Sequence, residues 1–487
     1  MAAMAYETVI GLEIHAQLLT ESKMFCACST KFGAQPNTNI CPVCTGQPGV
    51  LPVTNKKAIE LAIKTALALD CTIEPSSVFA RKNYFYPDLP KDYQVSQYEL
   101  PLATKGFLEI EFDGQVKKIG ITRVHLEEDA GKLNHQGADR IMGSESSLVD
   151  YNRTGTPLME IVSEPDLRSP REAAVFMEAL ANLLRYIGVC DAKMEEGSLR
   201  CDANISIMPA GSKKFGTRTE LKNMNSFKAV EKAMVVEAAR QQEIIEEGRA
   251  IIQETRVYDD TTGTTSSMRS KEEAHDYRYF PEPDLVPIEP SKQWVEEIHQ
   301  GLGELPQERI KRFVNIFKLP VQNAQLLVSS RPMADFFEAC VKLYNQPTAA
   351  ANWLLGEITA YLNEHKKTLA ETAFTPAALA ELLALIENGT ISGTGAKTVL
   401  IKVMETGKAV KEVVAESGLT QISDEGELVK VIEELIKNNP KQVEQYRGGK
   451  TTVLAFFVGQ VMKATKGRAN PGLVNQLLEK ELAQPSP

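Results

Sequence analysis

Polar and apolar residues alternate along several short segments in the N-terminal part of the chain. In Val9–Leu18 the apolar side chains fall at every second position, and Glu13, His15 and Gln17 fall between them. A period of two is typical of a β-strand, whose successive side chains point to opposite faces. A strand that gives one face to Glu, His and Gln packs only its other face into a core. We therefore expect the polar face to line a wet cavity.

Three further segments carry polar residues in the same way. The residues concerned are Arg200 and Asp202, Arg218 and Glu220, and, among apolar neighbours, Glu160. Around Glu127 and Glu128 the alternation is irregular, so the period alone leaves open which of these two carboxylates faces the others. Carboxylates and a histidine on rigid strands can hold Mg²⁺ and a nucleotide phosphate. The alternative for each segment is an amphipathic strand whose polar face meets bulk water.

Helical patterns interrupt these strands and dominate the rest of the chain. Segments Pro170–Tyr186 and Phe227–Glu247 have helix start and stop signals. A proline-rich segment, residues 279–290, precedes a region rich in Ala, Leu, Glu and Lys at helical spacing. The domains that we expect are a mixed α+β domain over 1–292, a helical domain over 293–400 and a small helical tail domain over 401–487.

Composition and charge restrict the class of protein. The 487 residues are too many for one core, and 43% of them are hydrophobic, which is ordinary for a soluble globular protein. We find no apolar run long enough to cross a bilayer and no signal peptide, so we expect a cytoplasmic protein. The net charge of −10 argues against binding nucleic acid over the whole surface.

A local basic patch in the tail is compatible with contact to a phosphate backbone. Its basic residues include Lys450, Lys463, Lys466 and Arg468. The alternative interpretation of this patch is a solvated helix face.

Four cysteines form two close pairs, Cys26 with Cys28 and Cys41 with Cys44, separated by twelve residues. Zn²⁺ prefers soft ligands in a tetrahedron, and two such pairs supply this geometry. Four thiolates leave no position for water, so we expect a structural zinc ion. The alternatives are ordinary thiols in a loop, or a redox pair at Cys41 and Cys44 without a thioredoxin-like context.

A glycine-rich phosphate loop is missing from the sequence. Segment Gly393–Thr398 resembles one, but Ala396 separates the Gly and Lys that the motif requires side by side. We expect the start of a helix there. No dinucleotide or kinase signature occurs either, so nucleotide binding has to depend on side chains and metal.

Several longer motifs are similar to one known family. They are Gly11–Leu18, Arg81–Lys91, His125–Lys132, Asp150–Pro157 with Glu160–Asp166, Met194–Asn204 and Ser270–Asp284. From about Tyr6 to its C-terminus, the chain resembles the GatB/GatE family, the B-subunit of the bacterial aspartyl/glutamyl-tRNA amidotransferase. The resemblance implies an N-terminal cradle with the fold of glutamine synthetase and the guanidino kinases, then an all-helical domain and a small helical tail domain that binds tRNA.

The resemblance also implies a reaction. Members of this family belong to a glutamine-hydrolysing ligase, and they use ATP and Mg²⁺ to phosphorylate the side-chain carboxylate of Glu-tRNA(Gln) or Asp-tRNA(Asn). A separate amidase, the A-subunit, releases ammonia, which travels through a tunnel to the acyl phosphate, and a small C-subunit holds the two larger proteins together. Because the chain shows no Ser-Lys arrangement for glutaminase chemistry, the ammonia has to come from such a partner.

The competing interpretation is a non-catalytic, zinc-bearing tRNA-binding adaptor. The polar strand faces argue against it, because a wall that binds RNA should be basic and not acidic.

Site residues follow from the resemblance position by position. The residues implied to be catalytic are Glu13, His15, Glu128, Glu160, Asp202 and Glu220, and all of these except Asp202 are expected to bind Mg²⁺. The resemblance, and not the strand period, selects Glu128 over Glu127. We expect Arg200 and Arg218 to contact ATP phosphates, since they share strand faces with the acids.

The cysteines and the tail also have counterparts in the family. The four cysteines match a zinc site that only some members carry, so the zinc is expected to stabilise the cradle and not to take part in the reaction. The basic tail residues Lys450, Lys463, Lys466 and Arg468 are implied to contact tRNA and to read its outer shape.

Overall fold

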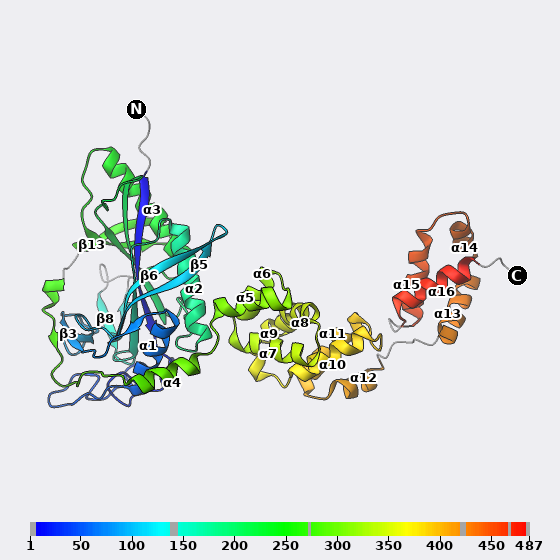
Figure 1. The fold of residues 1–487 in the computed structure, drawn as a ribbon, viewed down its shortest axis with the longest axis horizontal. Coiled ribbons are helices and arrows are strands. Elements are labelled where there is room, and N and C mark those ends of the chain that lie inside the picture. The colour runs from blue at the N-terminus through cyan, green and yellow to red at the C-terminus, as the bar shows by residue number, and fades with distance from the viewer. Residues whose placement is uncertain (1–5, 137–144, 271–273, 419–424, 466–468, 484–487) are drawn as a thin grey trace. The chain divides into compact units, whose positions relative to one another are not determined.

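The computed structural model describes residues 6–136, 145–270, 274–418, 425–465 and 469–483. The chain divides into two compact units, Met1–Leu305 and Pro306–Pro487. The first unit is rich in sheet, and the described part of the second consists of helices and their connections (Figure 1). The predicted change from a mixed α/β region to a helical region is confirmed, whereas the division into three domains at residues 292 and 400 stays a prediction.

Within the described residues, the first unit is built on a nine-stranded sheet. In spatial order its strands are β13 (Thr264–Ser270), β12 (Glu254–Asp259), β11 (Thr219–Lys222), β10 (Leu199–Pro209), β1 (Tyr6–Gln17), β9 (Pro157–Ser163), β6 (Gln115–Glu128), β5 (Ala103–Phe112) and β2 (Thr72–Ile73). Neighbouring strands run antiparallel except β11 and β12, which are parallel. The four segments with polar alternation therefore lie on adjacent strands of one sheet.

Two smaller sheets accompany the large one. The first has the order β14 (Phe280–Pro281), β3 (Ala80–Asn83) and β4 (Tyr93–Ser96), and the second pairs β7 (Lys132–Gln136) with β8 (Ser146–Asp150). Strand β14 comes from the proline-rich segment after residue 279, so this segment returns to the first unit and pairs with β3.

Helices α2 (Pro170–Tyr186) and α3 (Phe227–Glu246) pack against each other and against strands of the large sheet (Figure 1). The hydroxyl of Ser169 accepts the backbone N–H of Glu172 and caps α2, which has Pro170 at its first position. Both helices were predicted at these positions. On β1 the apolar positions are buried and the intervening positions are half-buried, which confirms that one face packs into the core.

The described part of the first unit has two further α-helices: α1 (Lys56–Ala68), which contacts β5 and β6, and α4 (Lys292–Leu302), which contacts α1. A short 3₁₀ helix, η1 (Ala274–Tyr277), precedes β14. Residues of β3 and η1 help to line a cavity on the polar face of the sheet.

The second unit contains helices α5 to α16. They are α5 (Pro306–Phe317), α6 (Val321–Val328), α7 (Arg331–Leu343), α8 (Pro347–Trp353), α9 (Thr359–His365), α10 (Pro376–Glu387), α11 (Gly393–Thr406), α12 (Val410–Ser417), α13 (Glu425–Asn438), α14 (Pro440–Arg447), α15 (Val453–Ala464) and α16 (Pro471–Ala483), with the short π-helix η2 (Leu354–Ile358) and the 3₁₀ helix η3 (Leu369–Glu371). Ser392 caps α11, so the glycine-rich segment after it is a helix start, as predicted.

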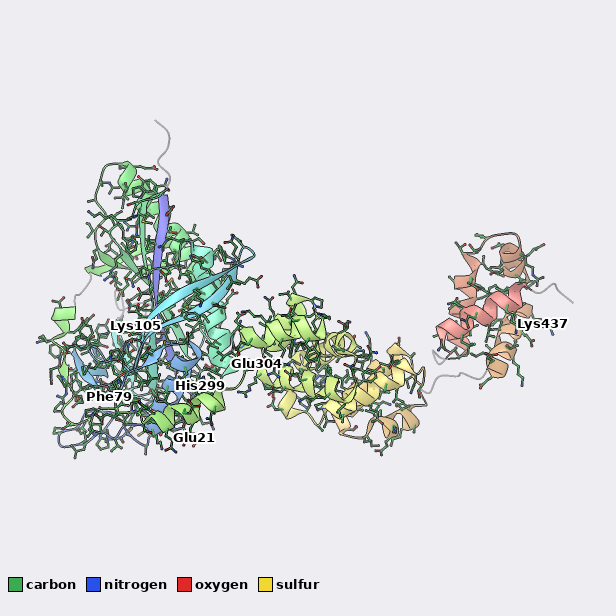
Figure 2. The ribbon with its side chains drawn as sticks, viewed as in Figure 1. Glu21, Phe79, Lys105, His299, Glu304 and Lys437 are labelled. Carbon is green, nitrogen blue, oxygen red and sulfur yellow. The ribbon has the colours of Figure 1, made fainter. Side chains whose placement is uncertain are left out.

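Helices α13 to α16 share an apolar core that includes Leu428, Phe457, Val461 and Leu478, each buried completely. Charged residues such as Lys437, in the last turn of α13, lie outside this core (Figure 2). Among the residues that the structure describes, none of the helices combines the length and the apolar character needed to cross a lipid bilayer.

Candidate active site and metal centre

Strands β6, β9 and β1 bring His125, Glu160 and His15 into one row across the sheet. The antiparallel register pairs Glu160 with His15 on one side and with His125 on the other. Paired residues project from the same face of a sheet. His15 Nε2 lies 3.4 Å from Glu160 Oε2, and His125 Nε2 lies 3.3 Å from the same oxygen. Two imidazoles therefore hold one buried carboxylate between them.

Glu127 extends this row. Its Oε1 lies 3.6 Å from His15 Nε2. One ligand atom from each of His15, Glu127 and Glu160 falls within 4.8 Å of the others, so the three side chains can share one cation. The Nδ1 atom of His125 is buried and has no hydrogen-bond partner among the described residues, which fits a polar site completed by a ligand or water. Carboxylate oxygens with one imidazole suit a divalent cation such as Mg²⁺ or Mn²⁺.

Glu128 lies on the other face of β6, which corrects the expectation that it joins Glu160. In the register with β9, Glu127 pairs with Leu158 two positions after His125, and Glu128 pairs with Pro157. Consecutive strand residues point to opposite faces, so only Glu127 can share the face of His125. The carboxylate of Glu128 forms an ion pair with Lys91 and accepts the backbone N–H of Val95 at 3.0 Å.

The charges of this group are strongly coupled. Burial by itself lowers the pKa of His15, but the hydrogen bond to Glu160 and the charges of Glu160, Glu127 and Asp202 raise it to about 9. Burial raises the pKa of Glu160, but the charge of His125 and hydrogen bonds from both histidines lower it well below its usual value. Without metal, His15 is therefore a protonated partner of Glu160, and a cation that binds there has to displace that proton.

Three other predicted acids, Glu13, Asp202 and Glu220, meet on strands β1, β10 and β11. The register pairs Glu13 with Asp202, and Asn204 with Glu220. The amide of Asn204 donates to Glu13 Oε1 at 2.9 Å. The ammonium of Lys222 contacts Asp202 and lies 3.5 Å from Glu220 Oε1. The structure thus brings these acids together as a second group, with Lys222 balancing two of the carboxylates.

His15 and Glu160 of the first group, together with Glu13, Asp202 and Glu220 of the second, line one cavity of about 1270 Å³ on the polar face of the sheet. This volume is large enough for a nucleotide together with part of a second substrate. Tyrosines Tyr84, Tyr277 and Tyr279 form another part of the wall, and the ammonium of Lys82 lies 4.9 Å from the centre of the Tyr277 ring. Burial by itself lowers the pKa of Lys82, but the charges of Tyr279, Glu127, Tyr84 and Glu160 raise it above its usual value.

Sequence reasoning assigned no role to Lys82, His125 and Glu127. Two features of the sequence point to these residues. Lys82 lies inside the motif Arg81–Lys91, and His125 and Glu127 are two positions apart on one strand. A strict period of two over the end of β6 would have selected Glu127.

The two predicted arginines have different surroundings. Arg218 is exposed in the loop before β11 and lines the cavity, where its guanidinium is accessible to a phosphate. Arg200 Nη2 lies 2.9 Å from Asp129 Oδ1, and Asp129 is buried. Burial raises the pKa of Asp129, but the charges of Arg200 and Arg153 lower it below its usual value. Arg200 therefore has a carboxylate partner within the protein.

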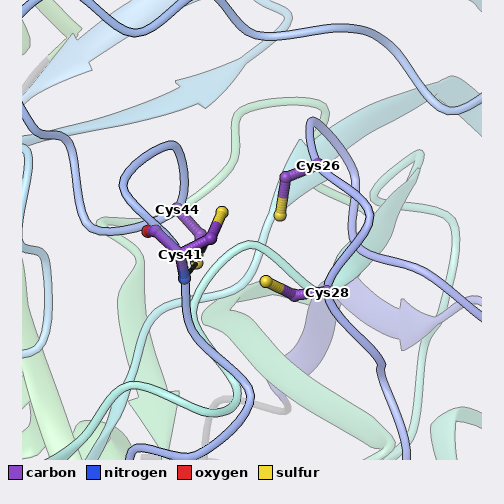
Figure 3. A group of neighbouring side chains, drawn as sticks. All are labelled: Cys26, Cys28, Cys41 and Cys44. Carbon is purple, nitrogen blue, oxygen red and sulfur yellow. Dashed lines mark hydrogen bonds between the residues drawn. The ribbon is translucent and has the colours of Figure 1, made fainter.

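The four clustered cysteines converge from two loop segments (Figure 3). One sulfur from each of Cys26, Cys28, Cys41 and Cys44 lies within 4.8 Å of the others, and those of Cys41 and Cys44 are 3.9 Å apart. Zn–S bonds of about 2.3 Å in a tetrahedron place the sulfurs about 3.8 Å apart. The cluster therefore fits a zinc ion.

Aromatic packing and proton sharing also distinguish this cluster. Phe25, next to Cys26, packs edge-on against buried Phe79 at 5.3 Å between ring centres. A hydrogen bond from the Cys26 thiol lowers the pKa of Cys44 to about 4, whereas burial raises the pKa of Cys28 to about 11. Without metal, the cluster thus stabilises a thiolate at Cys44 next to protonated thiols, and full coordination releases the remaining protons.

The basic tail residues lie only partly within the described structure. Lys450 is exposed in the connection before α15, and Lys463 is exposed in the last turn of that helix. Lys466 and Arg468 lie outside the described residues. Whether these four side chains bind tRNA stays a prediction.

The chain, a sheet-based domain with a carboxylate-lined cavity followed by helices, matches two models of known protein domains. The model of the GatB/GatE catalytic domain matches residues 8–296, and that of the GatB domain matches residues 335–482. The chain belongs to the GatB/GatE family.

Full-length relatives agree with this assignment. Proteins named as the B-subunit of aspartyl/glutamyl-tRNA(Asn/Gln) amidotransferase, from Thermodesulfovibrio yellowstonii and Geotalea daltonii, are 56% and 55% identical to the chain, over 99% and 98% of its length. The relative from Carboxydothermus hydrogenoformans is 56% identical over 98% of the chain. The matches cover 100%, 100% and 99% of these relatives.

Proposed function

We propose that the chain is the phosphorylating and amidating subunit of a tRNA-dependent amidotransferase. It uses ATP to phosphorylate the side-chain carboxylate of Glu-tRNA(Gln), Asp-tRNA(Asn) or both, and ammonia then converts the acyl phosphate to the amide. The observation that carries the proposal is the cavity lined by His15 and Glu160, with Glu127 close enough to share a cation with them, in a chain similar over its full length to proteins named as this subunit.

The chemistry explains why such a cavity is needed. A carboxylate reacts poorly with ammonia because its leaving group is oxide. Transfer of the γ-phosphoryl group forms a bond to a carboxylate oxygen, breaks the bond to ADP and creates a phosphate leaving group. Ammonia then forms the C–N bond and phosphate departs. Phosphoryl transfer depends on in-line positioning and on neutralising charge on the phosphoryl oxygens.

Each side chain has a defined task in this proposal. His15, Glu127 and Glu160 hold the divalent ion, which supplies positive charge for the phosphoryl oxygens. Glu13, Asp202 and Glu220 form the second acidic group, which orients the substrates through Lys222 and Asn204. Arg218 contacts phosphate from the rim of the cavity.

The fold and the cysteine cluster complete the proposal. The cradle is proposed to share the fold of glutamine synthetase and the guanidino kinases, which transfer phosphoryl groups without a glycine-rich loop. The zinc ion held by the four cysteines is structural, because four thiolates leave no open coordination position.

The proposed partners are an amidase (the A-subunit) that supplies ammonia, a small C-subunit and the misacylated tRNA. Lys450 and Lys463 in the tail are proposed to contact the tRNA backbone. Their exposure and charge support this role, because phosphate contacts provide most of the sequence-independent affinity for RNA.

The test is ADP formation by the chain assembled with its amidase and its small partner protein. The arms are uncharged tRNA, Glu-tRNA(Gln) and Asp-tRNA(Asn), each with ATP and Mg²⁺. We expect ADP only with a misacylated tRNA, and the arm that responds names the substrate. Tight binding of tRNA without ADP in any arm would overturn the proposal and favour a non-catalytic tRNA adaptor.

A further inference from the structure

The side chain of Lys23 is buried against the cysteine cluster. Its exposed fraction is 1%, which makes it one of the largest side chains that the fold buries completely. Its Nζ lies 3.5 Å from Cys44 Sγ and 3.2 Å from the backbone oxygen of Tyr151. Removing an ammonium from water costs several kcal/mol unless a negative group compensates it. The carbonyl is neutral, so the sulfur is the partner that can carry the compensating charge.

Cys44 also accepts a second hydrogen bond. The backbone N–H of Cys41 donates to Cys44 Sγ at 3.2 Å. Four thiolates around one divalent cation leave a net negative charge on the sulfurs, and N–H donors stabilise that charge. Lys91, another lysine of the adjoining pocket, is paired with Glu128. Lys23 is therefore well placed to balance the cluster, whereas Lys91 already has a carboxylate.

We propose that Lys23 is the counter-ion of the zinc–thiolate centre. Its ammonium donates to Cys44 Sγ and stabilises the form with four thiolates, without binding the metal itself. The inference rests on the zinc centre proposed above, and it adds a residue that no metal-ligand motif contains.

The same ammonium connects the metal centre to the large sheet. It donates a hydrogen bond to the backbone oxygen of Tyr151, in the turn that leads to β9. In the same turn, the oxygen of Gly155 accepts the backbone N–H of Met24 at 2.7 Å. Strand β9 carries Glu160. Lys23 thus ties the zinc loop to the segment that enters the candidate active site.

The first test is zinc affinity of the full-length chain, measured by competition with a chromophoric chelator. Lys23→Met keeps the length of the side chain and removes its charge. We expect this variant to bind zinc about 10–100-fold more weakly than wild type, the range found when partners of metal ligands are removed. The matched control is Lys31→Met, which removes an exposed lysine from the loop between the cysteine pairs and should leave the affinity unchanged.

A spectroscopic readout separates this role from a general effect on folding. Co²⁺ bound by thiolates has a sulfur-to-metal charge-transfer band that responds to hydrogen bonds at the sulfur. We expect the band to shift in Lys23→Met and to stay at the wild-type position in Lys31→Met. If Lys23→Met does not fold, Lys23→Gln, which keeps an N–H donor without the charge, takes its place in both measurements.

The outcomes distinguish failure of the zinc centre from failure of the role proposed for Lys23. Wild-type protein that retains no zinc against the chelator would defeat the zinc centre and the inference together. Tight zinc binding by wild type, with equal affinity and an unshifted cobalt band in the Lys23 variant, would overturn the role of Lys23 and leave the zinc centre intact.

Discussion

Glu127 and Glu128 are adjacent in the sequence and buried to the same degree, each 2% exposed, but they serve opposite sides of the sheet. On the cavity side, Glu127 joins His15 and Glu160 in a group that can hold a cation. On the other side, Glu128 is paired with Lys91 in the pocket that also borders Cys26 and Cys44. A carboxylate that shares histidines with a second acid is available to a metal ion, whereas one neutralised by a lysine is not.

The comparison shows that strand register, and not residue type, decides which of the two carboxylates can bind a metal ion and which one stabilises the fold. Both sides contain buried carboxylates and cationic partners, so composition alone makes them look alike. They differ in charge balance: Glu127 shares two histidines with a second carboxylate, Glu160, whereas Glu128 has a lysine of its own. The predictions below test whether these two sides are as distinct in function as they are in geometry.

The largest effect is expected from Glu160→Gln on the cavity side. This change removes the charge that both histidines share, and we expect it to slow ADP formation by about 1000-fold. Glu164→Gln, on the exposed segment after β9, is the matched control and should keep wild-type rates. The measurement is ADP release by the complex with misacylated tRNA. A rate within tenfold of wild type in Glu160→Gln would remove Glu160 from the site.

The second-largest effect distinguishes Glu127 from Glu128 by the dependence of activity on Mg²⁺. Glu127→Gln should raise the Mg²⁺ concentration for half-maximal activity by about 10–100-fold, because it removes a candidate ligand. Glu128→Gln should leave that concentration unchanged, since Lys91 already occupies its carboxylate. The Mg²⁺ dependence of ADP release in both variants checks this, and the reverse order would show that the metal binds on the other side of β6.

Glu128→Gln should act on stability instead. It leaves the Lys91 ammonium, whose side chain is only 11% exposed, without its counter-charge. Breaking one partner of a buried ion pair costs about 3 kcal/mol or more. Urea unfolding should show this loss in Glu128→Gln, and a smaller loss in Glu127→Gln, whose removal relieves repulsion among the acids. Equal losses would contradict the distinction in charge balance.

Sequence alone predicted much of this geometry and missed two parts of it. The period of two placed Glu13 and His15 on the polar face of β1, and the helix signals placed α2 and α3 almost to the residue, because both depend on local patterns. The choice of Glu128 was wrong in position because it followed the resemblance and not the period of two that joins His125 to Glu127. Which face of β6 meets Glu160 is fixed by pairing with β9, a contact between distant segments. The pairing of Arg200 with Asp129 was missed for the same reason.

The pH dependence of the metal-free protein tests the charge coupling on the cavity side. The pKa of His15 is raised from about 6.5 to about 9, so the protonated form is favoured by folding. The resulting stability is complete below pH 6.5 and is lost as pH rises through 9. We expect the free energy of unfolding to fall by about 1–3 kcal/mol over this interval. Urea titrations of wild type and His15→Gln check this, since the variant should lack that part of the decline.

The smallest effect on catalysis is expected from the cysteine side. Cys41→Ser removes one sulfur of the cluster, so zinc content and the midpoint of thermal unfolding should both fall. Turnover per folded molecule should stay within about twofold, because Glu127, Glu160 and His15, on β6, β9 and β1, lie on the opposite face of the sheet from Glu128, which borders the cysteine pocket. Metal analysis, thermal unfolding and ADP release on the same preparation provide the three readouts. If turnover collapsed while the unfolding midpoint and the zinc content held, the cysteine side would take part in the reaction, and the separation of the two sides of the sheet would be wrong.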